Sequence, residues 1–204
     1  MMENLLEKAI AGMEKGGFEV VQLKTGAEAC EYLTGHIPAD KSVGVGGSMS
    51  VKESGAIEAL REKGCTVHTH WGAPPEKGPE IRRNARQADV YLCSANAVTK
   101  TGQMVLVDGT GNRVGAVCDG PEQVYFVVSQ NKVVDGGFTT AIARIKQFAC
   151  PKNAQRLGLK TSCALNGTCS DDCPDSMCRV SIVLDRVPRG RKMTVLLVEE
   201  TLGY

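Results

Sequence analysis

Two apolar runs, each followed by small polar residues, lie between Ala88 and Val114, where the chain reads ADVYLCSANAVTKTGQMVLVDGTGNRV. Each run has the length and composition of a buried strand. The residues that follow, SANAVT and DGTGNR, are small or polar and predict loops. Because open α/β sheets bind ligands beside the carboxyl ends of their strands, this stretch predicts both a sheet and a ligand site.

Strands and helices alternate on either side of this stretch. Apolar residues recur at helical spacing in some segments, and short apolar runs separate them. Such alternation predicts parallel strands joined by right-handed helical crossovers. We expect helices at 4–15, 25–34, 51–63, 80–87 and 136–148, and strands at 18–23, 42–45, 65–69, 88–93, 103–108, 113–118, 123–128, 180–184 and 193–198.

Local signals refine several of these elements. Thr25 followed by Glu28 is a capping-box pattern at a helix start. Pro151 is expected to disturb the last long helix, whose apolar face would include Phe148. The basic turn 186–192 is predicted to be a solvated loop that joins the last two strands as a hairpin. No linker or repeat interrupts the chain, so we predict a single domain at 1–204.

Composition excludes several classes of protein. The net charge is +1 and aromatic residues make up 4% of the chain, which argues against a nucleic-acid surface. The chain has no apolar run of about 20 residues, so no membrane insertion is expected. The first helix mixes Glu and Lys with apolar residues, unlike a signal peptide. We therefore predict a cytoplasmic globular protein.

A glycine-rich loop joins the predicted strand 42–45 to the next helix. Gly46 and Gly47 would let the backbone approach a ligand, and free amides at the helix start would hold an anion, with Ser48 and Ser50 as extra donors. The third glycine of the dinucleotide fingerprint is missing, and no Gly-Lys-Ser/Thr follows. A tight turn with a serine N-cap is an equally good interpretation of this loop.

The loop DGTGNR supplies the candidate catalytic residues. Arg113 would clamp a carboxylate or phosphate, and Asp108 would act as general base. The alternative is a simple turn in which Asp108 caps its own backbone, although turn chemistry does not call for Arg113. The residues expected to bind the ligand or cofactor are Gly46, Gly47, Ser48, Ser94, Asn96, Thr110, Gly111 and Asn112.

Five of the nine cysteines fall between positions 150 and 178, in a segment with almost no large apolar side chains. Clustered thiols in a reducing compartment are more often metal ligands than disulfides. Neither the zinc-knuckle nor the ferredoxin spacing is present, and a [4Fe–4S] cluster tolerates the looser spacings better than one zinc ion. We predict an irregular insertion at 150–179 that binds a [4Fe–4S] cluster, with zinc as the alternative; its ligands would be Cys163, Cys169, Cys173 and Cys178.

The remaining thiols and the histidines carry weaker signals. Cys150 is an alternative ligand but fits better as the buried end of a helix. The scattered Cys30, Cys65, Cys93 and Cys118 are expected to be buried small hydrophobes. His68 and His70 alternate on a strand and are expected to be solvent-facing polar residues rather than metal ligands.

The pairing of SANAVT with DGTGNR resembles the LUD domain, the family of lactate-utilisation protein C. The resemblance covers roughly the first 160 residues, and the NAQRLG motif at 153–158 with the cysteines resembles a subgroup that ends in four cysteines. It implies a Rossmann-like α/β sheet, parallel or mixed, with helices on both faces, similar to the ribose-5-phosphate isomerase and CoA-transferase superfamily. It also implies a role near lactate or another small organic acid.

Three functions remain open from the sequence. The chain is an enzyme that acts on a lactate-like acid or a sugar phosphate, a non-catalytic electron-transfer or regulatory subunit, or a structural zinc-binding protein. The expected partners are a small anionic metabolite and, in the redox interpretations, iron–sulfur oxidoreductase subunits. Assembly into a homo-oligomer is a further expectation.

Overall fold

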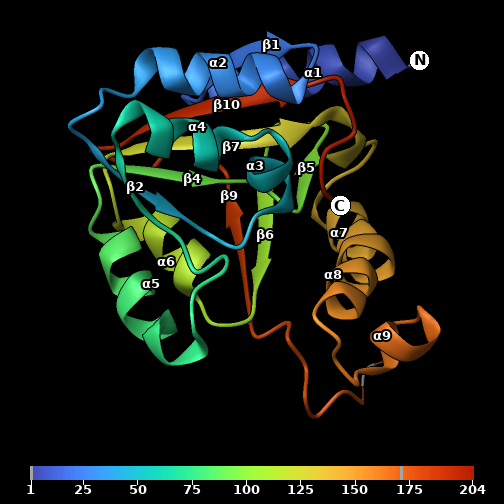
Figure 1. Cartoon of the computed structure of the whole chain (residues 1–204). Coiled ribbons are helices and arrows are strands. Elements are labelled where there is room, and N and C mark those ends of the chain that lie inside the picture. Colours follow the sequence, from blue (N-terminus) through green and yellow to red (C-terminus); the bar gives the residue numbers. More distant parts are fainter. Residues whose placement is uncertain (1, 171) are drawn as a thin grey trace.

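A computed structural model of the chain describes residues 2–170 and 172–204; residue 171, inside the predicted cysteine-rich insertion, lies outside the described residues. Two sheets pack together, and a stack of helices projects from them on one side (Figure 1). The larger sheet has six parallel strands in the order β1-β10-β7-β4-β2-β3. Its strands are β1 (Glu19–Leu23), β2 (Ser42–Val45), β3 (Thr66–His68), β4 (Val90–Cys93), β7 (Gln123–Ser129) and β10 (Lys192–Val198).

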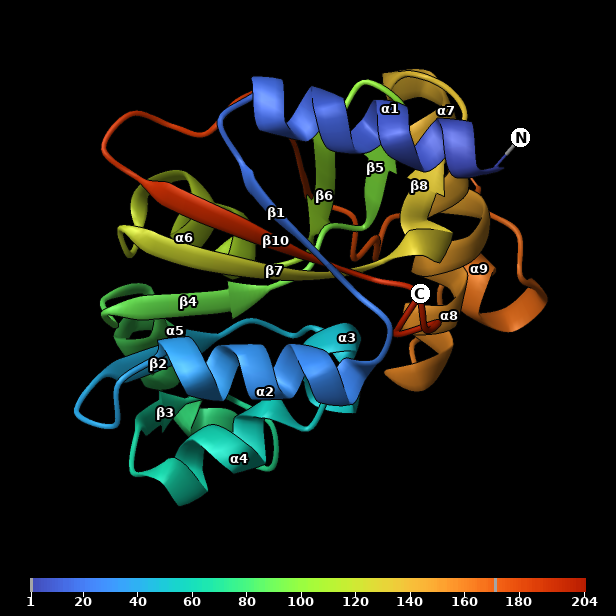
Figure 2. The same ribbon diagram turned by 90° about the horizontal axis from the view of Figure 1, so that it is seen from above.

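Side chains along the central strands alternate between two apolar cores. In β7, Val124 and Phe126 pack in one core, and Tyr125 and Val127 pack in the other. Burial on both faces explains why these strands are continuous apolar runs, as in other parallel sheets. One face is covered by α2 (Gly26–His36), α3 (Met49–Glu53) and α4 (Ala56–Lys63), and the other by α1 (Met2–Lys15), α5 (Gly78–Arg86) and α6 (Asn112–Asp119) (Figure 2).

A second sheet of four strands packs beside the first. Its order is β8-β5-β6-β9, with antiparallel pairing on both sides of β6. The register pairs Asp108 at the end of β6 with Val180 at the start of β9. The strands are β5 (Ala97–Thr99), β6 (Met104–Asp108), β8 (Val133–Val134) and β9 (Val180–Leu184).

The helical stack follows the second sheet. It begins with α7 (Phe138–Arg144), continues through the π-helical turn η3 (Ile145–Ala149) and ends with α8 (Cys150–Arg156). Pro151 lies in the first turn of α8, directly after the π-helical turn, so the predicted disturbance is confirmed without a break in the helix. Short turns complete the fold: η1 (Pro75–Lys77), η2 (Gln130–Lys132) and α9 (Ser162–Asn166).

The predicted α/β class with helices on both faces is confirmed, and so is the cap of α2, where Thr25 Oγ1 accepts the Glu28 amide at 3.2 Å. Other predictions were wrong. Residues 113–118 form helix α6 rather than a strand, because Gly111 at φ +78° and the Asp108 carboxylate start a helix there. Residues 97–99 form strand β5 rather than a loop, and α9 lies in the segment expected to be irregular.

The last two strands are not a hairpin. β9 is in the second sheet, whereas β10 is buried between β1 and β7 in the first. The connecting turn is not wholly solvated either, since Arg191 donates to the carbonyls of Gly120 and Pro121 at 2.7 and 2.5 Å. Phe148 is 39% exposed and carries Lys152 over its ring, so it does not belong to the predicted apolar face.

Candidate functional site

The carboxyl ends of three neighbouring parallel strands meet at one cavity. Ser50 lies in the helix after β2, Ser94 follows β4, and Lys132 ends the turn after β7. The cavity has a volume of about 70 Å³. This is the edge of the sheet where the sequence predicted a ligand. Its walls include Gly47, Ser48, Asn96, Arg113, Cys150 and Tyr204.

Lys132 is the most deeply buried charged residue of the site, with 3% of its surface exposed. Its Nζ donates to Ser50 Oγ at 2.6 Å and to Ser94 Oγ at 3.0 Å. Burial, with the nearby charges of Arg144 and Arg113, lowers the pKa of Lys132 to about 7. A lowered pKa means that part of this amine is neutral near neutral pH.

Arg113 connects the two loops that the sequence singled out. Its Nη2 donates to Asn96 Oδ1 at 2.8 Å and to the Val107 carbonyl at 2.6 Å, and its Nη1 donates to the Ser94 carbonyl at 3.3 Å. Asn96 Oδ1 also accepts the Val107 amide at 3.0 Å. The backbone at Gly46 lies close to the side chains of Tyr91 and Arg113. A Cβ at this position would lie 2.9 Å from the Tyr91 hydroxyl and 3.4 Å from Arg113 Cγ, so glycine fits here best.

Asp108 is occupied by backbone amides. Its Oδ2 accepts the amides of Arg113 at 2.9 Å and Val114 at 3.2 Å, and its Oδ1 accepts the Thr110 amide at 3.3 Å. These bonds match the turn-forming alternative and satisfy the first amides of α6. The catalytic roles of Asp108 and Arg113 stay predictions.

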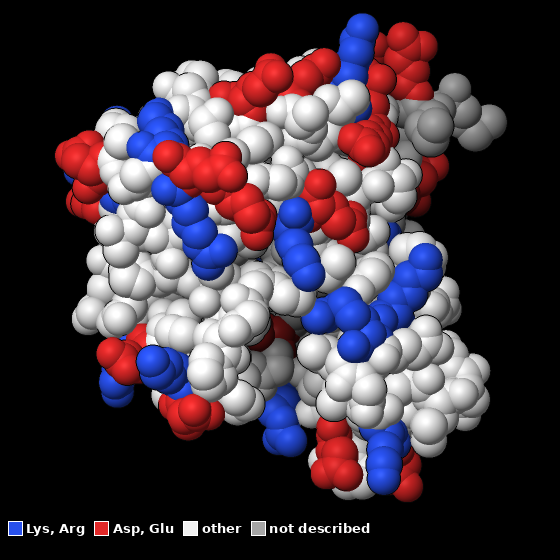
Figure 3. All heavy atoms as spheres, viewed as in Figure 1, with Lys and Arg blue, Asp and Glu red and all other residues white. Residues whose placement is uncertain are grey.

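A third cation, Arg144, bonds to the backbone of Asn96, which lines the cavity. Its Nη1 donates to the Asn96 carbonyl at 2.7 Å and its Nε to the Asn131 carbonyl at 3.3 Å. Burial lowers the pKa of Arg144 to about 10. Figure 3 shows Lys and Arg side chains gathered over α7 and α8, beside a hollow in this face of the molecule.

Positive charge exceeds negative charge at this site. Arg113 Nε lies 4.0 Å from Asp108 Oδ2. Within residues 2–170 and 172–204, no carboxylate forms an ion pair with Lys132 or Arg144. The charge of Glu53 raises the pKa of Lys132 without forming an ion pair with it. A further source of negative charge is Cys178, which lines the same cavity and whose pKa is held below its usual range by the hydrogen bond with Cys150.

Two cysteines meet at the other wall of the cavity. Cys178 lies two residues before β9, and the pairing of β9 with β6 brings it to Cys150 at the start of α8. Their Sγ atoms are 3.3 Å apart. Cys150 is buried, as the sequence predicted for a helix end.

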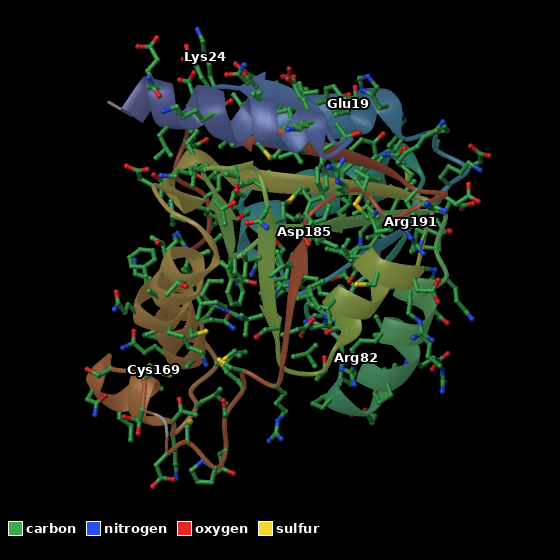
Figure 4. All side chains as sticks on the ribbon, turned by 180° about the vertical axis from the view of Figure 1, so that it is seen from behind. Glu19, Lys24, Arg82, Cys169, Asp185 and Arg191 are labelled. Carbon is green, nitrogen blue, oxygen red and sulfur yellow. The ribbon has the colours of Figure 1, made fainter. Side chains whose placement is uncertain are left out.

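The other cysteines of the segment are more dispersed. Cys163 is buried and its Sγ lies 3.3 Å from Thr161 Oγ1. Cys169 and Cys173 line a separate, wider hollow beside Lys146. Figure 4 shows Cys169 on the lobe that holds α9, at the opposite side of the molecule from Arg82. Burial lowers the pKa of Lys146, but the neighbouring thiols of Cys178, Cys169 and Cys150 together raise it by more.

The donor chemistry fits a soft metal or a cluster, since every candidate ligand is a thiol. The arrangement is not closed: in the part of the chain that the structure describes, no three Cys, His, Asp or Glu side chains are placed to hold one ion. The four predicted ligands therefore stay a prediction.

The comparisons with known proteins agree with this fold. The sequence model of the LUD domain matches residues 6–198, which is nearly the whole chain. The chain belongs to the LUD domain family. A crystal structure of a DUF162 family protein from Deinococcus radiodurans is similar over 97% of this chain and 98% of that one, with 12% identity and a TM-score of 0.58.

Other comparisons of this LUD domain are weaker. Ribose 5-phosphate isomerase A from Neisseria gonorrhoeae is 19% identical over 54% of this chain and 53% of that one, with a TM-score of 0.34. That likeness is too partial to inform the site. No curated protein matches the sequence significantly. No helix of the described chain is long and apolar enough to cross a membrane.

The predicted site residues fall into two groups in this LUD domain. Gly47, Ser48, Ser94, Asn96 and Arg113 line the cavity, together with Cys178. Thr110 and Asn112 instead bond to each other at 2.6 Å near the surface, and Gly111 starts α6. These three residues shape the loop and do not line the cavity.

Sequence reasoning missed Lys132 and Arg144, whereas Ser50 was expected as a donor to an anion. A signal existed for Lys132, because a lysine between two apolar strands, directly after the carboxyl end of β7, occupies the position where such folds bind ligands. His70 was also misjudged as solvent-facing: it is half-buried, and a Cβ on Gly47 would lie 3.4 Å from its ring. Burial and the charges of Arg82 and Arg156 lower the pKa of His70.

The scattered cysteines divide similarly. Cys65 and Cys93 are buried as predicted, and burial raises the pKa of Cys93 to about 12. Cys30 is only partly buried, and Cys118 is exposed, so the prediction for Cys118 was wrong. Its position on the outer side of α6 follows from the helix that replaced the predicted strand.

Proposed function

We propose that this LUD domain binds a small organic anion in the cavity at the carboxyl ends of β2, β4 and β7. The observation that carries the proposal is a group of three cations at this cavity, of which Lys132 is buried. Lys132, Arg113 and Arg144 lie together, and the described residues place only the Asp108 carboxylate within ion-pair distance of them. A bound carboxylate would accept charged hydrogen bonds from these cations.

The size of the cavity narrows the ligand. One water molecule needs at least about 10–15 Å³ of such space, so a cavity of about 70 Å³ holds on the order of five waters. That room suits an acid of a few carbon atoms better than a nucleotide. A lactate-like acid meets both the size and the charge, and the family is linked to lactate utilisation. A phosphorylated compound of similar size is the alternative.

We further propose that the thiols of the segment 150–179 bind a [4Fe–4S] cluster. Cys163, Cys169, Cys173 and Cys178 are the candidate ligands, and Cys150 lies beside the last of them. When bound, such a cluster would store and pass single electrons. The chain would then serve organic-acid redox metabolism in the cytoplasm, as an enzyme or as a subunit beside iron–sulfur oxidoreductase partners.

One observation favours zinc as a second candidate. Two thiolates on one tetrahedral zinc ion, with Zn–S bonds of about 2.3 Å, lie about 3.8 Å apart. The Cys150 and Cys178 sulfurs are 3.3 Å apart, which is near that value. A zinc site built on these two thiols would be structural and would leave the anion cavity as the functional site.

Calorimetric titration with lactate, and separately with a small phosphorylated acid, tests the anion site. We expect saturable binding to the wild type and at least about tenfold weaker binding to Lys132→Met, because a buried charge pair loses one partner. Lys100→Met is the matched control, since Lys100 is exposed and pairs with Asp135 at the surface. Equal affinity of Lys132→Met and wild type would contradict the proposal.

Metal and sulfide analysis after anaerobic purification tests the thiol site. About four irons and four sulfides per chain would support the cluster, and one zinc without sulfide would support the alternative. Cys169→Ser should lose the visible absorbance of a cluster, whereas Cys118→Ser, an exposed thiol outside the segment, should keep it. A metal-free protein with intact thiols would contradict both.

A further inference from the structure

The hydrogen bonds around Lys132 fix the orientation of the N–H bonds on its Nζ atom. Ser94 donates its hydroxyl proton to the Ala95 carbonyl at 3.1 Å, and Ser50 donates its proton to the Leu202 carbonyl at 3.1 Å. Both serine oxygens therefore face Lys132 as acceptors, and each takes one N–H of its amine. The Nζ atom has one position left.

The protonation state decides what that remaining position is. In the ammonium form it is a third N–H, and in the neutral amine it is the lone pair. The residue lines the cavity, and no described carboxylate pairs with it. Burial and two neighbouring guanidinium groups favour the neutral form, and a lysine desolvated in this way is a nucleophile toward carbonyl groups.

We infer that Lys132 is a covalent carbonyl-binding residue, which forms an imine with the C2 carbon of a small 2-oxo acid held in the cavity. The inference deepens the proposed function and rests on it, because the carboxylate of the acid is the anion that the cavity binds. Arg113 lines the same cavity, and its Nη1, which has one N–H beyond the bond to the Ser94 carbonyl, would donate to this carboxylate. The 2-oxo acid is the carbonyl counterpart of a 2-hydroxy acid of the same size.

The reaction balances without an oxidant or a reductant. The Nζ lone pair forms a bond to C2, and the C=O π electrons move to oxygen, which takes a proton from the nitrogen. The carbinolamine then loses the C2–O bond and its second N–H proton. The products are a C=N bond and one water molecule. The oxygens of Ser50 and Ser94 accept both N–H groups of the amine and so lie beside the protons that leave the nitrogen.

Two roles for the same contacts must be separated by experiment. A merely structural Lys132 would hold the loops after β2 and β4 through its two serine bonds and would never react. A purely electrostatic Lys132 would bind 2-hydroxy and 2-oxo acids alike. Only the covalent role requires the carbonyl, so trapping by reduction distinguishes it from both.

The test incubates the full chain with pyruvate and cyanoborohydride and maps the reduced adduct by peptide mass spectrometry. We expect one dominant adduct at Lys132, saturating with pyruvate, and none with lactate. Lys132→Arg should lose this adduct and Lys100→Arg should keep it. Because Lys132→Arg can misfold, the position of the adduct in the wild type is the deciding readout.

The outcomes separate the two proposals. Calorimetric binding of pyruvate and lactate without an adduct at Lys132 would overturn the imine and leave the anion site standing. Labelling spread evenly over exposed lysines would also overturn the imine. Absence of both binding and adduct would overturn the imine together with the proposed function.

Discussion

Strands β7 and β10 bury every residue after their first, whereas among the described residues from Leu157 to Cys178 only Thr161 and Cys163 are buried. We call the segment 157–179 the cysteine lobe and the rest of the described chain the body. The body is stabilised by apolar burial on both faces of a parallel sheet. The lobe is anchored at its base, where Cys178 meets Cys150 and the Arg179 amide donates to the Asp108 carbonyl at 2.9 Å.

The difference in burial means that the body and the cysteine lobe are stabilised by different interactions. The body needs its core and should tolerate changes in the lobe. The lobe lacks a core, so its order depends on its anchors and on any metal that the thiols bind. Mutations in the two parts should therefore have separable effects on stability, and the largest should come from the body.

Phe126→Ala should cause the largest loss. Phe126 is completely buried in the middle of β7, and removing such a ring costs about 3–5 kcal/mol. Urea denaturation followed by circular dichroism would measure the change in the free energy of unfolding. A loss below about 1 kcal/mol would mean that the body is not held by this core.

Lys132→Met should show the next largest effect, and this effect should depend on pH. The pKa of Lys132 is about 7 in the folded chain and about 10.5 when exposed, so between these values the unfolded chain binds more protons. The contribution of Lys132 to the free energy of unfolding of the wild type therefore rises between pH 7 and pH 10. Below pH 7 this residue destabilises the fold most. The free energy of unfolding of Lys132→Met, relative to that of the wild type, should therefore fall by about 2–4 kcal/mol between pH 7 and pH 10.

The measurement is urea denaturation of both proteins at several pH values. Other titrating groups are shared by the two proteins, so their difference isolates Lys132. A difference that stays constant with pH would show that the amine keeps its ordinary pKa.

Asp108→Ala should cost about 1–2 kcal/mol, because the carboxylate caps the amides at the start of α6. The residue also lies where body and lobe join. Hydrogen exchange should therefore rise in α6 and at the lobe anchor, and Asp108→Asn should retain part of the stability. Unchanged exchange in α6 would rule out this capping role.

Leu165→Ser should have the smallest effect. Leu165 lies in α9 of the lobe and is 74% exposed, so its replacement should change the free energy of unfolding by less than about 0.5 kcal/mol. Thermal denaturation would measure it beside Phe126→Ala. A large destabilisation would show that the lobe has a packing role in the body, and the distinction between the two parts would fail.

The sequence predicted the body better than the lobe, for a physical reason. Runs such as 123–128 are apolar enough to identify a strand buried on both faces. Residues 113–118 were misassigned because Val114 and Val117 fit a short strand as well as a helix, and the Asp108 cap that decides between them acts across a turn. The predicted hairpin at 180–198 was wrong because β9 and β10, although neighbours in the sequence, belong to different sheets.

The candidate site was predicted only in part. The loops that approach one another could be located, since parallel strands end at one edge of a sheet. Lys132 could not be connected to Ser50 and Ser94 from the sequence, because those contacts span 82 and 38 residues. The lobe offers no hydrophobic pattern at all, so its thiols predict a chemistry but not an arrangement.

The central position of β10 has a consequence for biosynthesis. Strand β1 touches the sheet only through β10, and the side chains of Glu19 and Thr194 that bond across this pair are 175 residues apart. As the chain leaves the ribosome, β1 and β7 must both wait with an unpaired edge until residues 192–198 emerge. Pairing at such long sequence separation is slow, so the nascent chain passes through a stage in which two apolar strands expose unpaired edges.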